Sequence, residues 1–162
     1  MHAHIVCISS RDGALHSSRA ARHEGMNISE SDVIRETHHK LVAFVVDDDP
    51  LIRTYIRSIL QEQGYSVFAF ESGIEALSGL ADREGDVSVV ITDVEMPGLD
   101  GIAFAEEVNR RFCGIPVLMM SGSPQGIGSS RRRWPFLGKP FMPAALIAAA
   151  QQVLVSTQAV SA

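Results

Sequence analysis

Residues 89–101 read VVITDVEMPGLDG, and this stretch decides the fold. Its apolar first half ends in a single carboxylate, Asp93, and the chain then turns at Pro97 and Gly98. An apolar run of this length between turn residues is typical of a buried strand. In open α/β sheets, the loops that follow the carboxyl ends of such strands hold the ligand site. We therefore expect Asp93 to be the central functional residue.

The composition is that of a globular protein with one main domain. The chain has 162 residues, of which 46% are hydrophobic and 20% charged, and its formal net charge of -5 disfavours nucleic acid as the main partner. No apolar run reaches the roughly 18 residues that span a bilayer. Cys7 and Cys113 form no CxxC pair, so neither a disulfide framework nor a thiolate zinc site is indicated. We expect a cytoplasmic location without membrane contact.

The ends of the chain differ from its centre. All six histidines precede residue 40, among small and charged residues without the spacing of a metal site. We predict a flexible leader at 1–40, a folded domain at 41–155 and a C-terminal tail at 156–162. No helix-turn-helix pattern follows the folded domain, so we expect no DNA-binding domain.

Predicted strands and helices alternate along the folded domain. Apolar runs predict strands at 41–46, 66–70, 87–92 and 115–120, and periodic stretches between them predict helices that end near 64, 81 and 112. Helix starts are marked by Asp49 before Pro50, by a Ser72–Glu75 capping box and by Asp100. The first helix is predicted to bury Leu51, Ile52, Tyr55, Ile56, Ile59 and Leu60 on one face. This alternation implies a parallel sheet with helices on both faces.

The segment from Ser121 to Lys139 is short for a further helix. Seventeen residues separate these two positions, whereas a mean helix, a strand and two connections need roughly 22. We predict a short or missing fourth helix and a short fifth strand that contains Trp134, Phe136 and Leu137. A last helix, opened by Pro143, follows with a buried stripe of Leu146, Ile147, Ala150, Val153 and Leu154.

Polar side chains follow four of the predicted strands. If the strands at 41–46 and 87–92 are neighbours, five groups converge at one edge of the sheet: Asp47, Asp48, Asp93, Ser121 and Lys139. Three carboxylates so close repel one another unless a cation lies among them, and hard oxygen ligands suit Mg²⁺. A metal beside a nucleophilic carboxylate, a hydroxyl and an ammonium suits phosphoryl transfer. The sequence therefore predicts phosphoryl transfer onto Asp93.

These motifs resemble the receiver domain of two-component response regulators. The resemblance covers about residues 41–155 and rests on Val46-Asp47-Asp48-Asp49-Pro50, on the stretch 92–101, on Met120-Ser121-Gly122 and on Lys139-Pro140-Phe141, in the order of the family. It implies a flavodoxin-like, doubly wound, five-stranded parallel sheet of order 2-1-3-4-5, an order carried over from the family.

The resemblance also implies what the acidic residues do. Asp93 would be the phosphoacceptor and form a 4-aspartylphosphate with a phosphoryl group from the phosphohistidine of a sensor histidine kinase or a histidine phosphotransfer protein. Asp48, Asp93 and the backbone carbonyl of Glu95 would bind Mg²⁺ directly. Asp47 would hold the metal through water.

The remaining site residues would act on the phosphoryl group. By the same resemblance, Ser121 and Lys139 would each contact one phosphoryl oxygen. Phe136 matches the aromatic residue that moves inward with the hydroxyl in the family, so Ser121 and Phe136 would form the switch.

The predicted function is that of a stand-alone receiver. Such a single-domain response regulator signals by protein–protein interaction or acts as a phosphate sink, and no motif specifies its kinase, its target or its oligomeric state. It catalyses its own phosphorylation and dephosphorylation, so we do not expect an enzyme that turns over a separate substrate. Two alternatives stay open: a pseudo-receiver that docks without phosphorylation, and a metal-dependent phosphatase with Glu95 as the acid two residues after the nucleophile.

Overall fold

The computed structural model describes residues 40–83, 85–123 and 133–158. In this part of the chain, five parallel strands form one sheet of order β2-β1-β3-β4-β5. The strands are β1 (Val42–Val46), β2 (Ser66–Phe70), β3 (Val89–Asp93), β4 (Val117–Ser121) and β5 (Phe136–Gly138). The predicted parallel sheet and its order are confirmed.

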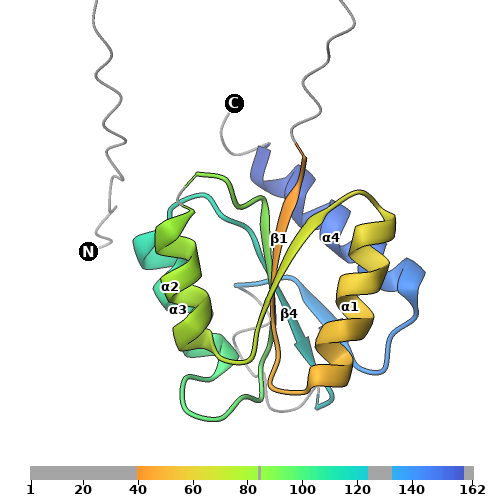
Figure 1. Ribbon diagram of the computed structural model, residues 1–162, viewed down its shortest axis with the longest axis horizontal. Helices are drawn as coiled ribbons and strands as arrows, with labels where there is room; N and C mark the ends of the chain where they lie inside the picture. Colours follow the sequence, from red (N-terminus) through yellow and green to blue (C-terminus); the bar gives the residue numbers. More distant parts are fainter. Residues whose placement is uncertain (1–39, 84, 124–132, 159–162) are drawn as a thin grey trace, which may run out of the picture. The chain divides into compact units, whose positions relative to one another are not determined.

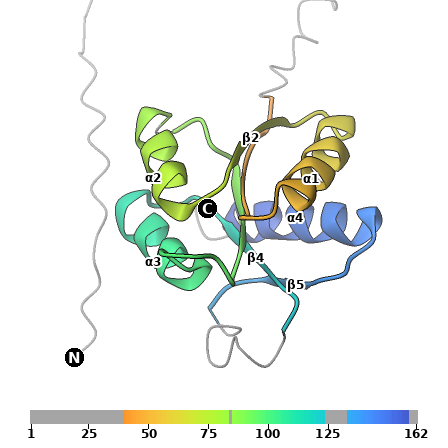
Figure 2. The ribbon, with the colours of Figure 1, turned by 60° about the horizontal axis from the view of Figure 1, so that its bottom comes forward.

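Helices cover both faces of the sheet (Figure 1 and Figure 2). α1 (Pro50–Glu62) and α4 (Pro143–Gln158) lie on one face, and α2 (Gly73–Asp82) and α3 (Gly101–Arg111) lie on the other. Along β1, Phe44 and Val46 belong to the apolar cluster with α2 and α3, while Ala43 and Val45 belong to the cluster with α1 and α4. The apolar runs of the central strands thus reflect burial on both faces.

The helix starts follow the predicted capping residues. The side chain of Asp49 accepts a hydrogen bond from Leu51 N at 2.8 Å, and that of Asp100 accepts one from Ala103 N at 2.8 Å. The Ser72 hydroxyl accepts one from Glu75 N at 3.3 Å. Each cap satisfies a backbone N–H that the helix itself leaves without a partner.

The buried face of α1 is narrower than predicted. Leu51 is 77% exposed and Tyr55 40% exposed, so the prediction that both are buried is wrong, whereas Ile56 and Leu60 are fully buried. Leu51 lies about 140° around the helix from Ile56, which places it on the solvent side. The Tyr55 ring instead stacks on Phe141, with ring centroids 6.1 Å apart.

The fifth strand is also shorter than predicted. Trp134 lies in a bend before β5, although it is buried in the cluster on the α3 side of the sheet. Pro135 has no N–H to donate to a ladder, and its carbonyl accepts the bond from Met119 N at 3.0 Å, next to the strand. In α4 the predicted buried stripe is confirmed for Leu146, Ala150 and Val153, whereas Ile147 and Leu154 are only partly buried against the same cluster.

Three predictions concern residues that the structure does not describe. The leader at 1–40 falls almost wholly outside the described residues, the end of the tail at 159–162 lies outside them, and so does most of the segment that we expected to lack a full fourth helix. In the described part of the chain, no helix combines the length and the apolar character needed to cross a membrane.

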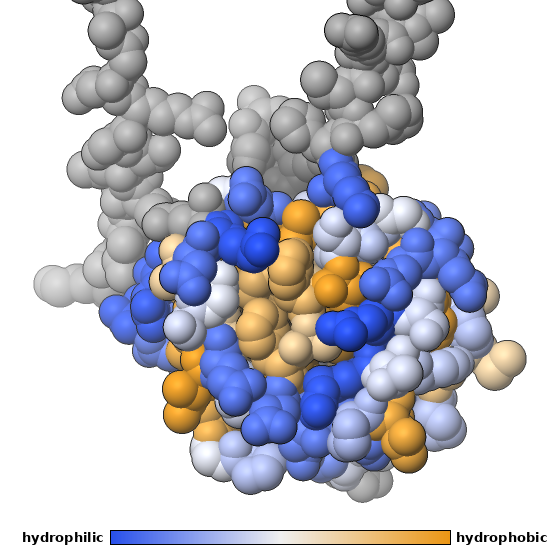
Figure 3. Space-filling model, viewed as in Figure 1, coloured by the Kyte–Doolittle hydropathy of each residue, from blue (hydrophilic) through white to orange (hydrophobic). Residues whose placement is uncertain are grey.

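β2 is an edge strand, and all five of its residues are partly exposed. Figure 3 shows apolar surface at this edge, between more hydrophilic surface over α1 and α2. At the other edge, β5 has only three residues. The polar side chains gather elsewhere, at the carboxyl ends of β1, β3, β4 and β5.

Candidate functional site

Asp93 is the last residue of β3 and is only 4% exposed. Its Oδ1 atom lies 2.7 Å from Lys139 Nζ, and its Oδ2 atom accepts a hydrogen bond from Glu95 N at 2.8 Å. The backbone is held as well, because Thr92 Oγ1 donates to Asp93 O at 3.0 Å. Both oxygens of this carboxylate are therefore oriented before any ligand binds.

Gly101 fixes the backbone behind Asp93. It opens α3 and donates its N–H to Val94 O at 3.0 Å. A Cβ atom at this position would overlap the carbonyl oxygen of Asp93. Only glycine allows the helix to begin this close to the strand end, so this residue sets the position of Asp93 through the main chain.

Asp47 follows β1 and is 1% exposed. Its Oδ2 atom lies 2.6 Å from Lys139 Nζ, and its Oδ1 atom accepts a hydrogen bond from Asp49 N at 2.9 Å. Burial raises the pKa of Asp47 above its ordinary value, and the hydrogen bond from Lys139 opposes that shift.

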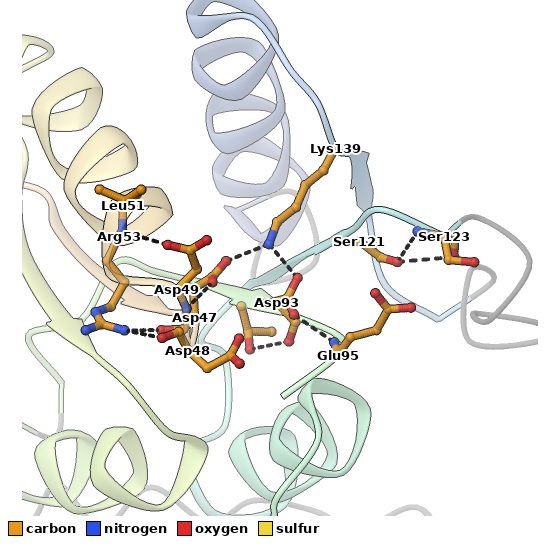
Figure 4. A network of polar contacts seen from close by, with 11 residues as sticks. Asp47, Asp48, Asp49, Leu51, Arg53, Asp93, Glu95, Ser121, Ser123 and Lys139 are labelled. Atoms are coloured by element: carbon orange, nitrogen blue, oxygen red, sulfur yellow. Dashed lines mark hydrogen bonds and ion pairs between the residues drawn. The ribbon is translucent and has the colours of Figure 1, made fainter. Parts of the chain in front are cut away.

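Lys139 bridges the two buried carboxylates (Figure 4). It follows β5, and its backbone N–H donates a hydrogen bond to the backbone carbonyl of Ser121 at 2.8 Å. Burial alone would lower the pKa of its ammonium group, but the hydrogen bonds and charges of Asp47 and Asp93 outweigh burial and raise it. The bond from Lys139 to Pro140 is a cis peptide. The structure thus brings together Asp47, Asp93 and Lys139 in direct contact.

The side chains of Asp48 and Glu95 are exposed beside this group. Asp48 lies on the same loop as Asp47, and Glu95 lies two residues beyond Asp93. Neither side chain joins the ion pairs of Lys139 with Asp47 and Asp93, and the predicted metal-binding roles of Asp48 and Glu95 stay predictions.

The hydroxyl of Ser121 points toward its own loop. Ser121 ends β4 and is 1% exposed, so its place at the same edge agrees with the prediction. Its Oγ atom accepts a hydrogen bond from Ser123 N at 2.9 Å and donates one to Ser123 O at 3.1 Å. Figure 4 shows it directed toward Ser123, on the side away from Asp93.

Phe136 is partly buried at the start of β5, opposite Met119 of β4. It packs against the apolar cluster on the α2 and α3 face. Its register places it two residues along β5 from the level of Ser121, which pairs with Gly138. The predicted switch pair therefore lies on neighbouring strands.

Arg53 is a site residue that the sequence analysis missed. Its Nη1 atom donates to Asp47 O at 2.6 Å and to Asp48 O at 3.0 Å. The only sequence signal is an arginine one turn into a helix that follows an acidic loop, and a helix of this length commonly carries exposed arginines. The contact becomes evident only from the structure.

The donor set has the chemistry that Mg²⁺ requires. Carboxylate and carbonyl oxygens are hard ligands, and the exposed Asp48 leaves room for water. Among the described residues, no three carboxylate, histidine or cysteine side chains are already grouped as a metal cluster. Lys139 pairs with Asp47 and Asp93 instead, so metal binding between them would compete with its ammonium group for the same oxygens.

The fold and site define a doubly wound α/β protein with an acid–lysine centre at the carboxyl edge of its sheet. The family model described as the response regulator receiver domain matches residues 43–151 of the sequence. The chain therefore belongs to the response regulator receiver family.

The chain matches some similar proteins over almost their whole length and others over a small part of it. NtrC of Klebsiella pneumoniae, a DNA-binding transcriptional regulator, is 38% identical over 80 residues, which are 49% of this chain but 17% of that protein. The structure of the Vibrio cholerae chemotaxis protein CheY4 has a TM-score of 0.64 at 31% identity and covers 70% of this chain and 98% of that one. The structure of NtrX from Brucella abortus has a TM-score of 0.69 at 29% identity. The match covers 75% of this chain and 28% of that one. The matched region corresponds to a receiver domain alone.

Proposed function

We propose that this chain is a single-domain response regulator in which Asp93 accepts a phosphoryl group in a Mg²⁺-dependent reaction. The observation that carries the proposal is the position of Lys139 Nζ, 2.6 Å from Asp47 Oδ2 and 2.7 Å from Asp93 Oδ1. A buried carboxylate supplies the nucleophile, and an ammonium beside it supplies positive charge where the phosphoryl oxygens would lie.

The donor is a phosphohistidine on a sensor kinase or a phosphotransfer protein. All six histidines of this chain precede residue 40, so the receiver domain itself offers no internal donor. A carboxylate oxygen of Asp93 forms a bond to phosphorus, the bond from phosphorus to the imidazole nitrogen breaks, and the nitrogen keeps the electron pair. The hydrogen bond from Glu95 N orients the carboxylate for this attack.

The other residues complete the site around the transferred group. Asp48, Asp93 and the carbonyl of Glu95 would hold Mg²⁺, with Asp47 binding it through water. When bound, Mg²⁺ neutralises charge on the phosphoryl oxygens. Lys139 and the Ser121 hydroxyl would each contact a phosphoryl oxygen, and Phe136 would follow the movement of Ser121.

The output is a protein–protein contact or the withdrawal of phosphate from a shared kinase. The protein catalyses its own phosphorylation and dephosphorylation and turns over no separate substrate. A cytoplasmic location agrees with this role, because sensor kinases present their phosphohistidine in that compartment.

Labelling with a small phosphodonor tests the proposal. The purified chain, incubated with acetyl phosphate and Mg²⁺, should gain the mass of one phosphoryl group, and excess EDTA should abolish the gain. Asp93→Asn should not be labelled. Asp100→Asn is the matched control, since Asp100 is an exposed acid that caps α3 and asparagine is an equally good cap. Undiminished labelling of Asp93→Asn would contradict the proposal.

A second candidate is a pseudo-receiver that docks on a partner without phosphorylation. The observation in its favour is the Ser121 hydroxyl, which makes both of its hydrogen bonds to Ser123 in its own loop and not to the site. A wild-type protein that binds neither Mg²⁺ nor beryllofluoride, yet remains folded, would favour this candidate.

A further inference from the structure

Arg53 contacts the acidic loop from the first turns of α1. One nitrogen, Nη1, donates to two successive carbonyl oxygens, at 2.6 Å to Asp47 O and 3.0 Å to Asp48 O. The side chain is partly buried, and Figure 4 shows it reaching the loop from the helix side. The bonds go to the main chain of the two residues whose carboxylates face the site.

These carbonyls lie where regular structure is interrupted. β1 ends at Val46, and Asp47 still donates its N–H to Phe70 O at 3.3 Å, but α1 begins only at Pro50. Backbone carbonyls between a strand and a helix need donors from elsewhere. Arg53 supplies them, and it thereby ties the peptide units of Asp47 and Asp48 to the helix.

Three further contacts fix the same loop. Asp49 N donates to Asp47 Oδ1 at 2.9 Å, and Asp49 Oδ1 accepts from Leu51 N at 2.8 Å. Arg53 N donates to Asp49 O at 3.0 Å. Together with the guanidinium group, they link the loop to the first turns of α1 at several points.

The geometry points to Arg53 as a positioning residue for the metal site: it holds the loop so that the carboxylates of Asp47 and Asp48 face Asp93. This inference rests on the proposed function, because it concerns Mg²⁺ binding at the same site. Groups that orient metal ligands typically change metal affinity by about tenfold or more when removed.

The hydrogen bonds of Arg53 and its positive charge should have opposite effects on the affinity of the site for Mg²⁺. A guanidinium cation near the site repels Mg²⁺, so removal of its charge alone would tighten Mg²⁺ binding. Loss of the two hydrogen bonds lets the loop relax, which would weaken binding. The sign of the change therefore separates a positioning role from a purely electrostatic one.

Arg57 provides a matched control. It lies one turn further along α1 and lines the same cavity of about 220 Å³ as Arg53, together with Pro50, Thr54 and Ala69. It carries the same charge, but the structure gives it no hydrogen bond to the acidic loop.

The test is calorimetric titration of the full chain with Mg²⁺ alone, for the wild type and for Arg53→Met, Arg53→Lys and Arg57→Met. Thermal unfolding of each variant first establishes a temperature at which all are folded. We expect Arg53→Met to weaken Mg²⁺ binding about tenfold. Arg53→Lys, which keeps the charge and can still donate, should recover most of the affinity, and Arg57→Met should bind as tightly as the wild type or more tightly.

Two outcomes would overturn the inference in distinguishable ways. If Arg53→Met binds Mg²⁺ as tightly as the wild type or more tightly, Arg53 does not position the ligands, and the proposed function is unaffected. If the folded wild type binds no Mg²⁺, the proposed function fails and this inference fails with it.

Discussion

Asp93 and Ser121 end neighbouring strands, yet their side chains are held in different ways. Both close a five-residue strand whose every residue is buried. The Asp93 carboxylate is oriented toward the site by Lys139 and Glu95, whereas the Ser121 hydroxyl makes both of its hydrogen bonds to Ser123 in its own loop. The carboxylate of Asp93, the proposed nucleophile, is thus preorganised, and the hydroxyl of Ser121 is not.

Under the proposed function, this difference indicates where a conformational change would occur. To contact a phosphoryl group on Asp93, Ser121 must exchange two bonds to Ser123, each with a net contribution of about 1 kcal/mol, for new ones. A ligand shifts such an equilibrium only by its different affinity for the two arrangements. We therefore expect the movement to begin at the end of β4.

The largest predicted effect concerns the backbone behind each strand end. Gly101→Ala should lower the free energy of unfolding by about 3 kcal/mol, because its Cβ atom would overlap Asp93 O. Gly122→Ala, beside Ser121, should be nearly neutral, since a Cβ atom there meets nothing within 4 Å. Urea unfolding measures both. Equal stability losses would contradict the contrast between the two strand ends.

Removal of the bridging ammonium should have the next largest effect. Lys139→Met should slow phosphorylation by acetyl phosphate about a hundredfold, the usual effect of losing one preorganised charge-stabilising donor. Lys40→Met is a direct control, because Lys40 and Lys139 are the two lysines of the chain and Lys40 is exposed. A Lys139→Met rate equal to the wild-type rate would count against the role.

Loss of the Ser121 hydroxyl should have a smaller effect. Ser121→Ala should slow phosphorylation about tenfold, less than loss of a preorganised donor would, because the hydroxyl first has to leave Ser123. Ser123→Ala should leave the rate unchanged, because Ser123 contributes only its backbone N–H and C=O. A Ser121→Ala rate as low as that of Lys139→Met would show that the hydroxyl is already in place.

The smallest predicted effect is on the pH dependence of stability. The pKa of Lys139 is raised above its ordinary value of 10.5, so the folded state holds this proton more tightly than the unfolded state. Its contribution to stability is fully present below pH 10.5 and is lost as pH rises through the folded-state pKa. Urea unfolding from about pH 8 to about pH 12 should show a steeper fall for the wild type than for Lys139→Met. Parallel curves would contradict this assignment.

The order of strands and helices follows from local features of the sequence. Apolar runs and the caps at Asp49, Ser72 and Asp100 predicted nearly every element, because these signals are carried by consecutive residues. The exposure of Leu51 was not predictable, since periodicity defines the direction of a buried face but not its width.

The position of three site residues at one edge of the sheet was predictable, but their contacts and the part played by Arg53 were not. Strand ends placed Asp47, Asp93 and Lys139 at one edge, and the structure pairs them. The rotamer of Ser121 and the reach of Arg53 to the acidic loop depend on tertiary contacts, which no local pattern encodes.

The central claim is that Asp93 itself carries the phosphoryl group. Borohydride reduction of the protein after treatment with acetyl phosphate and Mg²⁺ converts an aspartyl phosphate to homoserine, which peptide mass spectrometry locates. We predict homoserine at residue 93 and at no other aspartate. Homoserine at position 47 or 48, or a stable phosphate on Ser121, would contradict the account.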